Sequence, residues 1–239
     1  MVIDRLHIFP STAAVEAFNR VTLAETGILF GTRALTLKRL SEELHAASAD
    51  ERRPISAVGR RLLLEEVVTR HYTGGAGVLA GLTGFPGFVT SLDNLFGELK
   101  QALITTDSFT ATVRAMPANG RLTELAALYG LYSRALTEQG LLDSHDQELL
   151  ALTELRSGTH LPPLFDDMTG MTVHAMYDFT PLQLALIAEL SRRIPVTLHL
   201  PYDPDRETLY AYVARAADRI EALDGSDLLL EPIFEEPQG

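Results

Sequence analysis

The stretch GMTVHAMYDFTPLQLALIAELSRR, residues 170–193, decides the fold. Its first part predicts a short strand over 172–176, and the apolar spacing after the turn predicts an amphipathic helix over 181–192. The alternation continues to the end of the chain, with a strand over 196–200, a helix over 206–223 and a strand over 227–230. Strands that alternate with helices predict a parallel sheet that is covered by helices on its faces.

The N-terminal part of the chain shows the same alternation. It predicts a strand over 5–9, a helix over 13–23, a strand over 27–31 and a helix over 36–44. Between the two alternating parts, the pattern indicates only loops and helices, over 55–72, 91–104, 121–139 and 143–155. We therefore predict an α/β sheet domain made of 1–54 and 158–239, interrupted by an inserted helical subdomain over 55–157.

Composition restricts the classes of function. The chain has a net charge of −12, but residues 1–72 carry ten Lys/Arg against nine Asp/Glu, so a local nucleic-acid contact is expected only there. The absence of cysteine excludes a disulfide scaffold, a thiolate zinc site and a thiol nucleophile. No run approaches the about 18 apolar residues of a membrane span, and no secretory signal is recognisable. We expect a cytoplasmic protein with no membrane partner.

The sequence does not indicate a phosphate-binding loop. Such a loop needs glycines, whose backbone N–H groups approach the phosphates, and a lysine. The segment after the first predicted strand, PSTAAVEAF (10–18), has neither, and the two lysines of the chain, Lys38 and Lys100, do not follow a glycine. The segment GGAGVLAG (74–81) follows no predicted strand and lacks the dinucleotide-binding spacing. We therefore predict no nucleotide-binding residue and no cofactor.

One short stretch, LLDSHDQELL (141–150), gathers acidic and imidazole side chains. They are Asp143, His145, Asp146 and Glu148. Acids are favoured near a helix N-terminus, so we interpret them as a solvated helix start, with a metal hydrolase built on the first three as a minor alternative. Since His174 and His199 lie in apolar strands and no nucleophile motif is present, we predict no catalytic and no metal-binding residue.

Basic residues concentrate in the first third of the chain. They are Arg33, Lys38, Arg39, Arg52, Arg53, Arg60 and Arg61, interleaved with Glu42, Glu43, Glu51, Glu65 and Glu66. Two interpretations remain open. These residues contact nucleic-acid phosphates, in which case binding weakens with salt, or they form solvated faces.

Three stretches together resemble the first motor domain of UvrD-like, superfamily 1 helicases. ILFGTRALTLKRLSEEL (28–44) is similar to the strand, turn and helix that contact single-stranded DNA in that family. LAALYGLYSRALTEQGLLDSHDQELLA (125–151) is similar to the closing part of its helical insertion, and MTVHAMYDFTPLQLALIAEL (171–190) to its magnesium-binding strand and helix. The resemblance implies a RecA-like, P-loop NTPase-like parallel sheet with an inserted helical subdomain. It also implies DNA contacts by Thr32, Arg33, Lys38 and Arg39.

The magnesium-binding residues of that family are missing at the matching positions. Asp178 and Gln183 fall on the second Asp and the final Gln of the family's pattern, which sets the register. His174 and Ala175 then fall on the Asp-Glu pair that holds magnesium and activates water. Because the phosphate loop is missing too, the resemblance implies an inactive ATPase site, in which these four residues occupy degenerate Walker B positions.

A helicase fold without ATPase residues resembles the B subunits of AddAB-type helicase-nucleases, in which an inactivated helicase half precedes a PD-(D/E)XK nuclease domain. The turn FTPLQ (179–183) is similar to that group. The resemblance implies a non-catalytic N-terminal domain of a DNA-repair exonuclease subunit. We expect it to act as a scaffold and guide single-stranded DNA in double-strand break processing, beside an active helicase subunit of AddA type, in a longer protein that continues beyond Gly239. The alternative is a protein–protein interaction or structural module without DNA binding.

Overall fold

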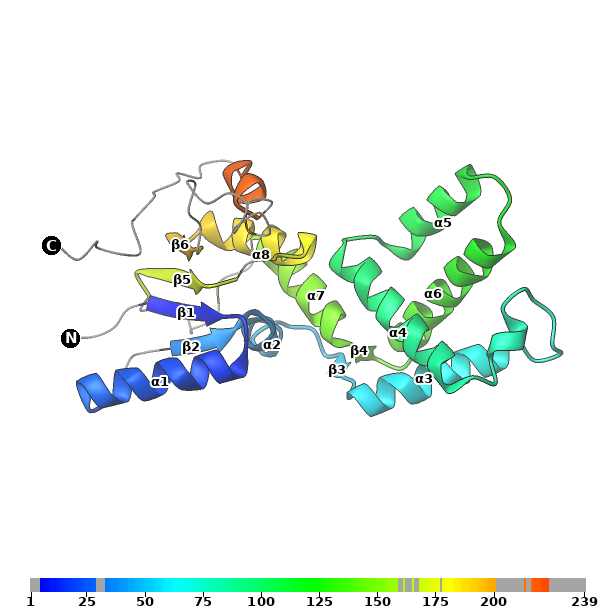
Figure 1. The fold of residues 1–239 in the computed structure, drawn as a ribbon, viewed down its shortest axis with the longest axis horizontal. Helices are drawn as coiled ribbons and strands as arrows, with labels where there is room; N and C mark the ends of the chain where they lie inside the picture. Colours follow the sequence, from blue (N-terminus) through cyan, green and yellow to red (C-terminus); the bar gives the residue numbers. More distant parts are fainter. Residues whose placement is uncertain are drawn as a thin grey trace, which may run out of the picture. The chain divides into compact units, whose positions relative to one another are not determined.

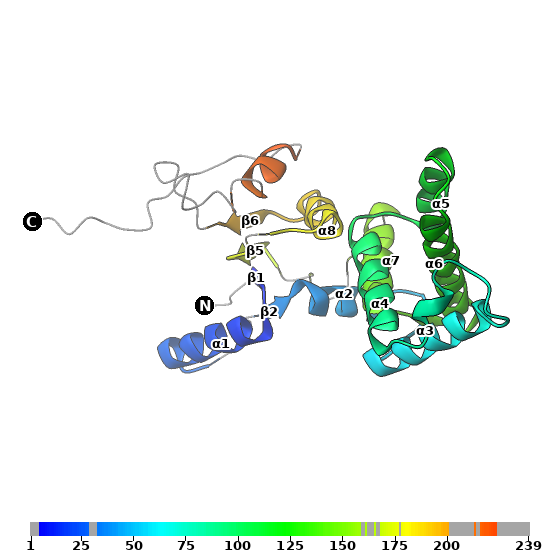
Figure 2. The same ribbon diagram turned by 45° about the vertical axis from the view of Figure 1, so that its right-hand side comes forward.

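The computed structural model describes residues 5–28, 33–158, 161, 165, 168–176, 178–200, 213 and 216–223 (Figures 1 and 2). The chain divides into two compact units: residues up to 44 together with those from 155 onward, and residues 45–154. Residues 45–54 group with the second unit, since Arg53 and Pro54 pair with Leu141 and Leu142. We call them the sheet unit and the helical unit and describe each by itself.

The described part of the sheet unit contains four parallel strands in the order β2-β1-β5-β6 (Figure 1). The strands are β1 (Arg5–Phe9), β2 (Arg33–Thr36), β5 (Gly170–His174) and β6 (Val196–His199). Its described helices are α1 (Thr12–Thr26), α2 (Leu37–Ala46), which extends two residues into the helical unit, and α8 (Pro181–Ser191). The predicted α/β fold, with a parallel sheet flanked by helices in a RecA-like arrangement, is confirmed.

The two central strands have different side chains on their two faces. Leu6, Ile8, Met171 and Val173 are fully buried on one face. On the opposite face, His7 and Phe9 contact Phe18 of α1, with ring centroids 4.7 Å and 5.0 Å apart. Parallel strands connected through helices cross over in the right-handed sense, and the chain leaves β1 and β5 in opposite directions along the sheet. Helix α8 therefore covers the face opposite to α1.

The helical unit is held together by its own apolar core. Its helices are α3 (Ala57–His71), α4 (Pro86–Gln101), α5 (Thr106–Ala115), α6 (Gly120–Glu138) and the part of α7 (Ser144–Arg156) up to Glu154, with the 3-10 turn η1 (Ala80–Leu82) and the strands β3 (Arg53–Pro54) and β4 (Leu141–Leu142). Leu64, Leu92, Phe96, Leu128 and Tyr132 are at most 2% exposed and form the centre of this core.

Several predicted element boundaries were wrong. The strand expected over 27–31 does not begin at Gly27, since this glycine ends α1 with φ 76°, a conformation that costs glycine little. The described strand of this region is β2, and residues 29–32 lie outside the described part. Helix α4 begins at Pro86 rather than near Ser91, because proline is well suited to a first helical turn.

The sequence did not predict some of the observed elements, and some predicted elements lie partly or wholly outside the described residues. The pattern indicated neither helix α5 nor the two-residue strands β3 and β4, which are too short to show a period. Of the helix predicted over 206–223, the structure describes Val213 and 216–223, with 216–221 helical. The strand predicted over 227–230 lies outside the described residues. Within the described residues, no helix is long and apolar enough to cross a membrane.

Candidate functional site

The candidate site is the edge of the sheet at which β1 and β5 end. Open parallel sheets bind ligands outside the carboxyl ends of their strands, at the point where the strand order reverses. Here the chain continues from β1 to β2 on one side and from β5 to β6 on the other, so the order reverses between β1 and β5. Phe9 and His174 are the last residues of these two strands.

The turn that follows β1 is too short to enclose a phosphate. Only Pro10 and Ser11 separate Phe9 from Thr12, where α1 begins, whereas a phosphate-binding loop has about eight residues. Pro10 has no N–H group to offer. The Ser11 hydroxyl caps its own helix, because Oγ accepts a hydrogen bond from the N–H of Ala14 at 3.2 Å. The described turn therefore lacks the row of free N–H groups that binds phosphate.

The end of β5 carries no carboxylate. His174 is its last residue, and Ala175 follows in the left-handed conformation with φ 48°, which costs an L-residue about 1–2 kcal/mol. The N–H of Ala175 donates to the carbonyl of His199 at 3.0 Å, which ties the end of β5 to β6. Asp178 lies exposed in the loop before α8. The end of β5 therefore offers one imidazole and a strained alanine where a magnesium site would need carboxylates.

Gln183, which matches the final Gln of the helicase pattern, has a local structural role. Its side-chain oxygen accepts from the N–H of Thr180 at 3.1 Å, and its own N–H donates to Thr180 Oγ1 at 3.3 Å. These reciprocal bonds form a capping box at the start of α8, with Pro181 at the first helical position. The spacing Thr-x-x-Gln is the sequence signal that predicts this role.

Stacked aromatic and imidazole rings occupy the strand ends. Phe9 and His174 are nearly parallel, with centroids 4.6 Å apart and an interplanar angle of 8°. His174 Nε2 lies 2.9 Å from Nδ1 of His7, within hydrogen-bond distance. His199 meets His174 edge-on at 5.3 Å. Rings from β1, β5 and β6 therefore pack together at this edge.

His174 and His7 are neutral at pH 7, because folding lowers the pKa of both rings. Burial, and then the neighbouring His7 and His199, lower the pKa of His174 to about 4. Burial also lowers the pKa of His7, helped by Arg5 and His199. Magnesium prefers oxygen ligands, and the described residues contain no group of three or more His, Cys, Asp or Glu side chains suited to a metal ion. His7 and His174 therefore form a packed, uncharged contact between β1 and β5.

The His174 ring predicts that the sheet unit becomes less stable in acid. A histidine whose pKa is lowered by folding binds fewer protons in the folded state than in the unfolded state. Its contribution to the free energy of unfolding is therefore complete above pH 6.5 and is lost as the pH falls toward 4. Because the ring is only half-buried, solvent screening limits the effect to about 1 kcal/mol. The test is urea unfolding at pH 7 and at pH 4.5, with His174→Phe as the variant that keeps a stacked ring. Between pH 7 and pH 4.5, we expect the free energy of unfolding to fall by about 1 kcal/mol less in this variant than in the unsubstituted chain. An equal loss in both proteins would contradict this role.

The family model described as ADDB, N-terminal, matches residues 17–224. The chain belongs to this family. A search of curated proteins finds no match. Membership associates this AddB N-terminal domain with DNA repair through the AddB subunit.

The predicted DNA-contacting residues of the AddB N-terminal domain do not form one cluster. Arg33 begins β2, whereas Lys38 and Arg39 lie in α2, just after β2 ends, about 10 Å further along the strand direction. Arg39 pairs with Glu42 at 3.0 Å and Glu43 at 2.7 Å. Lys38 is exposed and makes no described ion pair. Thr32 lies outside the described residues.

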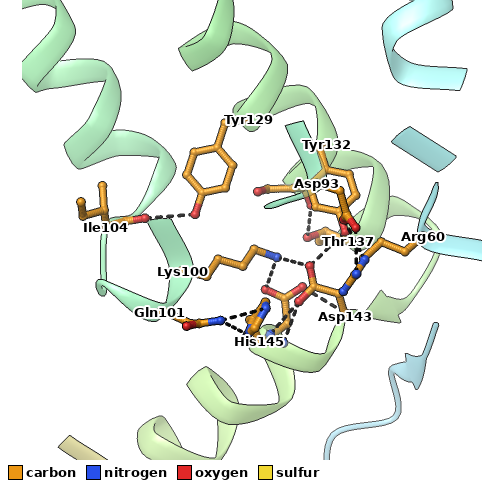
Figure 3. A network of polar contacts seen from close by, with 12 residues as sticks. Arg60, Asp93, Lys100, Gln101, Ile104, Tyr129, Tyr132, Thr137, Asp143 and His145 are labelled. Carbon is orange, nitrogen blue, oxygen red and sulfur yellow. Dashed lines mark hydrogen bonds and ion pairs between the residues drawn. The ribbon is translucent and has the colours of Figure 1, made fainter. Parts of the chain in front are cut away.

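The acidic cluster at the start of α7 is buried, so its interpretation as a solvated helix start was wrong. Figure 3 shows Lys100 of α4 pointing toward Asp143. Its Nζ lies 2.7 Å from a carboxylate oxygen of Asp143 and 2.7 Å from one of Asp146. Both side chains of the Lys100–Asp143 pair are only 4% exposed. Tyr132 donates its hydroxyl to Asp143 Oδ2 at 2.9 Å. Lys100 thus fills the place that a metal would take between the carboxylates.

The remaining partners make this cluster a structural connection. Asp143 Oδ1 accepts from the N–H groups of His145 and Asp146, both at 2.9 Å, and so caps α7. Burial raises the pKa of Asp143, but the Lys100 ammonium outweighs it and keeps the pKa below its usual range. Burial, together with the Asp143 charge, keeps the pKa of Asp146 raised. One lysine therefore ties α4 to the start of α7.

Proposed function

We propose that this chain is the non-catalytic, helicase-like N-terminal domain of a DNA-repair exonuclease subunit. It acts as a scaffold and as a surface that guides single-stranded DNA during double-strand break processing. An active helicase subunit of AddA type supplies ATP hydrolysis. One observation carries this proposal: at the strand-order reversal of a RecA-like sheet, a two-residue turn replaces the phosphate loop, and His174-Ala175 replaces the carboxylates.

Within the described residues, this edge lacks two separate requirements of ATP hydrolysis. Phosphate binding needs several converging N–H groups, and the described turn between β1 and α1 has a proline and a self-capped serine instead. Magnesium binding needs oxygen ligands, whereas β5 ends on neutral His174. Restoring one requirement would not restore the other, which supports a scaffold rather than a motor.

The DNA-guiding part of the proposal rests on the first turn of α2. This turn begins directly where β2 ends, at the same edge of the sheet as Phe9 and His174. Thr36 Oγ1 accepts from the N–H of Arg39 at 3.2 Å and fixes the helix start, leaving the exposed Lys38 free of described ion pairs. The lysine ammonium and the helix N-terminus both carry positive charge. A lysine at this position is therefore suited to bind a phosphate of the DNA backbone.

The proposal predicts no functional nucleotide binding. In calorimetric titrations with MgATP and MgADP, we expect no saturable binding at micromolar concentrations. The double variant His174→Asp, Ala175→Glu restores the carboxylates without a phosphate loop, so we expect no ATP hydrolysis from it either. Saturable micromolar binding accompanied by hydrolysis in the unsubstituted chain would refute the proposal.

An interaction or structural module without DNA binding is the alternative. It is favoured by the net charge of −12 and by the pairing of Arg39, Arg61 and Arg70 with glutamates on their own helices. Fluorescence anisotropy with a labelled oligo-dT at two salt concentrations separates the two functions. A DNA-guiding surface predicts salt-sensitive binding whose salt slope falls by about one in Lys38→Ala, while Arg114→Ala, which changes an exposed arginine outside the predicted DNA contacts, serves as the control. Absence of binding at low salt supports the alternative.

A further inference from the structure

The helical unit has an apolar groove that the proposed function does not use. It has a volume of about 440 Å³ and lies between the segment around η1, the first half of α4 and the start of α6. Leu82, Phe85, Phe88, Leu92, Leu95 and Arg121 are among its lining residues. Among the residues that the structure describes, no acidic side chain lines it.

One carboxylate holds the loop that forms the groove wall. Glu124 of α6 accepts hydrogen bonds from the hydroxyl of Tyr72 at 2.7 Å and from the N–H of Leu79 at 2.9 Å, and also from the N–H of Val78. Next to this contact, Gly77 has φ 138°, and a Cβ there would lie 2.7 Å from the Tyr72 ring. The loop is therefore anchored in one conformation, and the groove is preformed.

Two large apolar side chains of the groove face solvent. Phe85 is 62% exposed and Leu82 is 43% exposed, although both lie beside the buried Leu79 and Leu92. Isolated exposed apolar residues are common, but several around one hollow indicate a binding surface. Helix-in-groove recognition uses apolar residues one helical turn apart, which fits a groove lined mainly by leucine and phenylalanine.

The charge of the groove is opposite to that of the chain. Arg121 is the charged residue in the lining, is exposed, and makes no ion pair in the described part of the structure. Glu124, one turn further along α6, is engaged by the loop. In a chain with a net charge of −12, this groove therefore presents a free positive charge beside an apolar surface.

We propose that this groove binds an amphipathic helix of a partner protein, with apolar side chains in the groove and an acidic residue paired with Arg121. This rests on the proposed function, which makes the motor subunit the partner. A second copy of the chain fits less well, because two chains of charge −12 repel each other. Single-stranded DNA also fits less well, because its sites combine several cations with exposed aromatic faces, whereas leucines dominate here.

Photo-crosslinking tests this inference in the full chain. p-Benzoylphenylalanine is placed at Phe85, and the chain is co-expressed with an AddA-type motor subunit and irradiated. We expect a crosslink to one motor-subunit peptide that is helical, amphipathic and acidic at one position. The further change Arg121→Glu should reduce its yield about tenfold, as expected for an opposed charge pair.

Two matched controls test whether the crosslink is specific to the groove. The possible results also distinguish a failure of this inference from a failure of the proposed function. Arg114→Glu reverses another exposed arginine of the helical unit, outside the groove lining, and should leave the crosslink unchanged. The photoreactive residue at Val21, 55% exposed in the sheet unit, should not label the same peptide. The subunits could associate while the photoreactive residue at the position of Phe85 labels nothing, a second copy of the chain, or added oligo-dT. In each of these cases only this inference is wrong. If they do not associate, the AddA-type partner of the proposed function is wrong, and the groove's partner with it.

Discussion

Replacing Lys100 with methionine is expected to lower the free energy of unfolding of the helical unit by about 3–5 kcal/mol. Methionine keeps the length and most of the volume of the lysine side chain, so the core stays filled. The change removes the ammonium that lies 2.7 Å from both Asp143 and Asp146. It leaves Asp143, only 4% exposed, and the partly buried Asp146 facing each other without this ammonium, and solvent cannot relieve the cost at Asp143.

Urea unfolding followed by circular dichroism measures this loss, and hydrogen exchange locates it in α4 and at the start of α7. The chain offers a matched control, because Lys38 is its only other lysine and is exposed. Lys38→Met should change the free energy of unfolding by less than about 0.5 kcal/mol. A loss below about 1 kcal/mol in Lys100→Met would show that the carboxylates are reached by water or protonated at little cost.

The sheet could be predicted because its signals are local. Apolar strands followed by helices with a capped start recur along the chain, and their alternation requires parallel pairing. That both alternating parts of the chain belong to one sheet was also predictable, since the helical unit carries its own periodic pattern and separates them in the sequence.

The environment of Asp143 could not be predicted in the same way. Its partner Lys100 lies 43 positions earlier in the chain, on another helix. Acidic residues at a helix start are usually solvated, and nothing within α7 distinguishes a solvated acid from one buried against a lysine. The available signal was the position of Lys100 directly after the buried Leu99, four residues beyond Phe96. A charge within an apolar stretch of this kind indicates a buried partner.

At the candidate site, some features could be predicted from the sequence and others could not. The missing glycines and lysine of the β1–α1 turn were visible in the sequence, and the structure adds that the turn has two residues. Gln183 was assigned by resemblance, but its local capping bond to Thr180 explains its position without any ligand. The stack of Phe9, His7 and His174 depends on strand order, which no local pattern reveals.

Replacing Glu124 with alanine is expected to destabilise the helical unit by about 2–3 kcal/mol and to release the loop that borders the groove. Hydrogen bonds to an ionised group contribute about 1.5–3 kcal/mol each, and solvent can replace part of them here. Burial raises the pKa of Glu124, but the bonds from Leu79, Tyr72 and Val78 outweigh it and lower the pKa, so the group is ionised at pH 7. Hydrogen exchange at the Val78 and Leu79 amides should become much faster, because both lose their acceptor.

Two further variants test whether this anchor is responsible. Glu138→Ala removes another glutamate of α6, exposed near its end, and should leave both amides protected. Gly77→Ala disturbs the same anchor from the other side, since its Cβ would meet the Tyr72 ring at 2.7 Å and φ 138° is unfavourable for alanine. Because both changes act on one contact, the double variant should lose less stability than the two single losses combined. Full additivity would mean that the loop is held independently by Gly77 and Glu124, and that the groove wall does not depend on a single carboxylate.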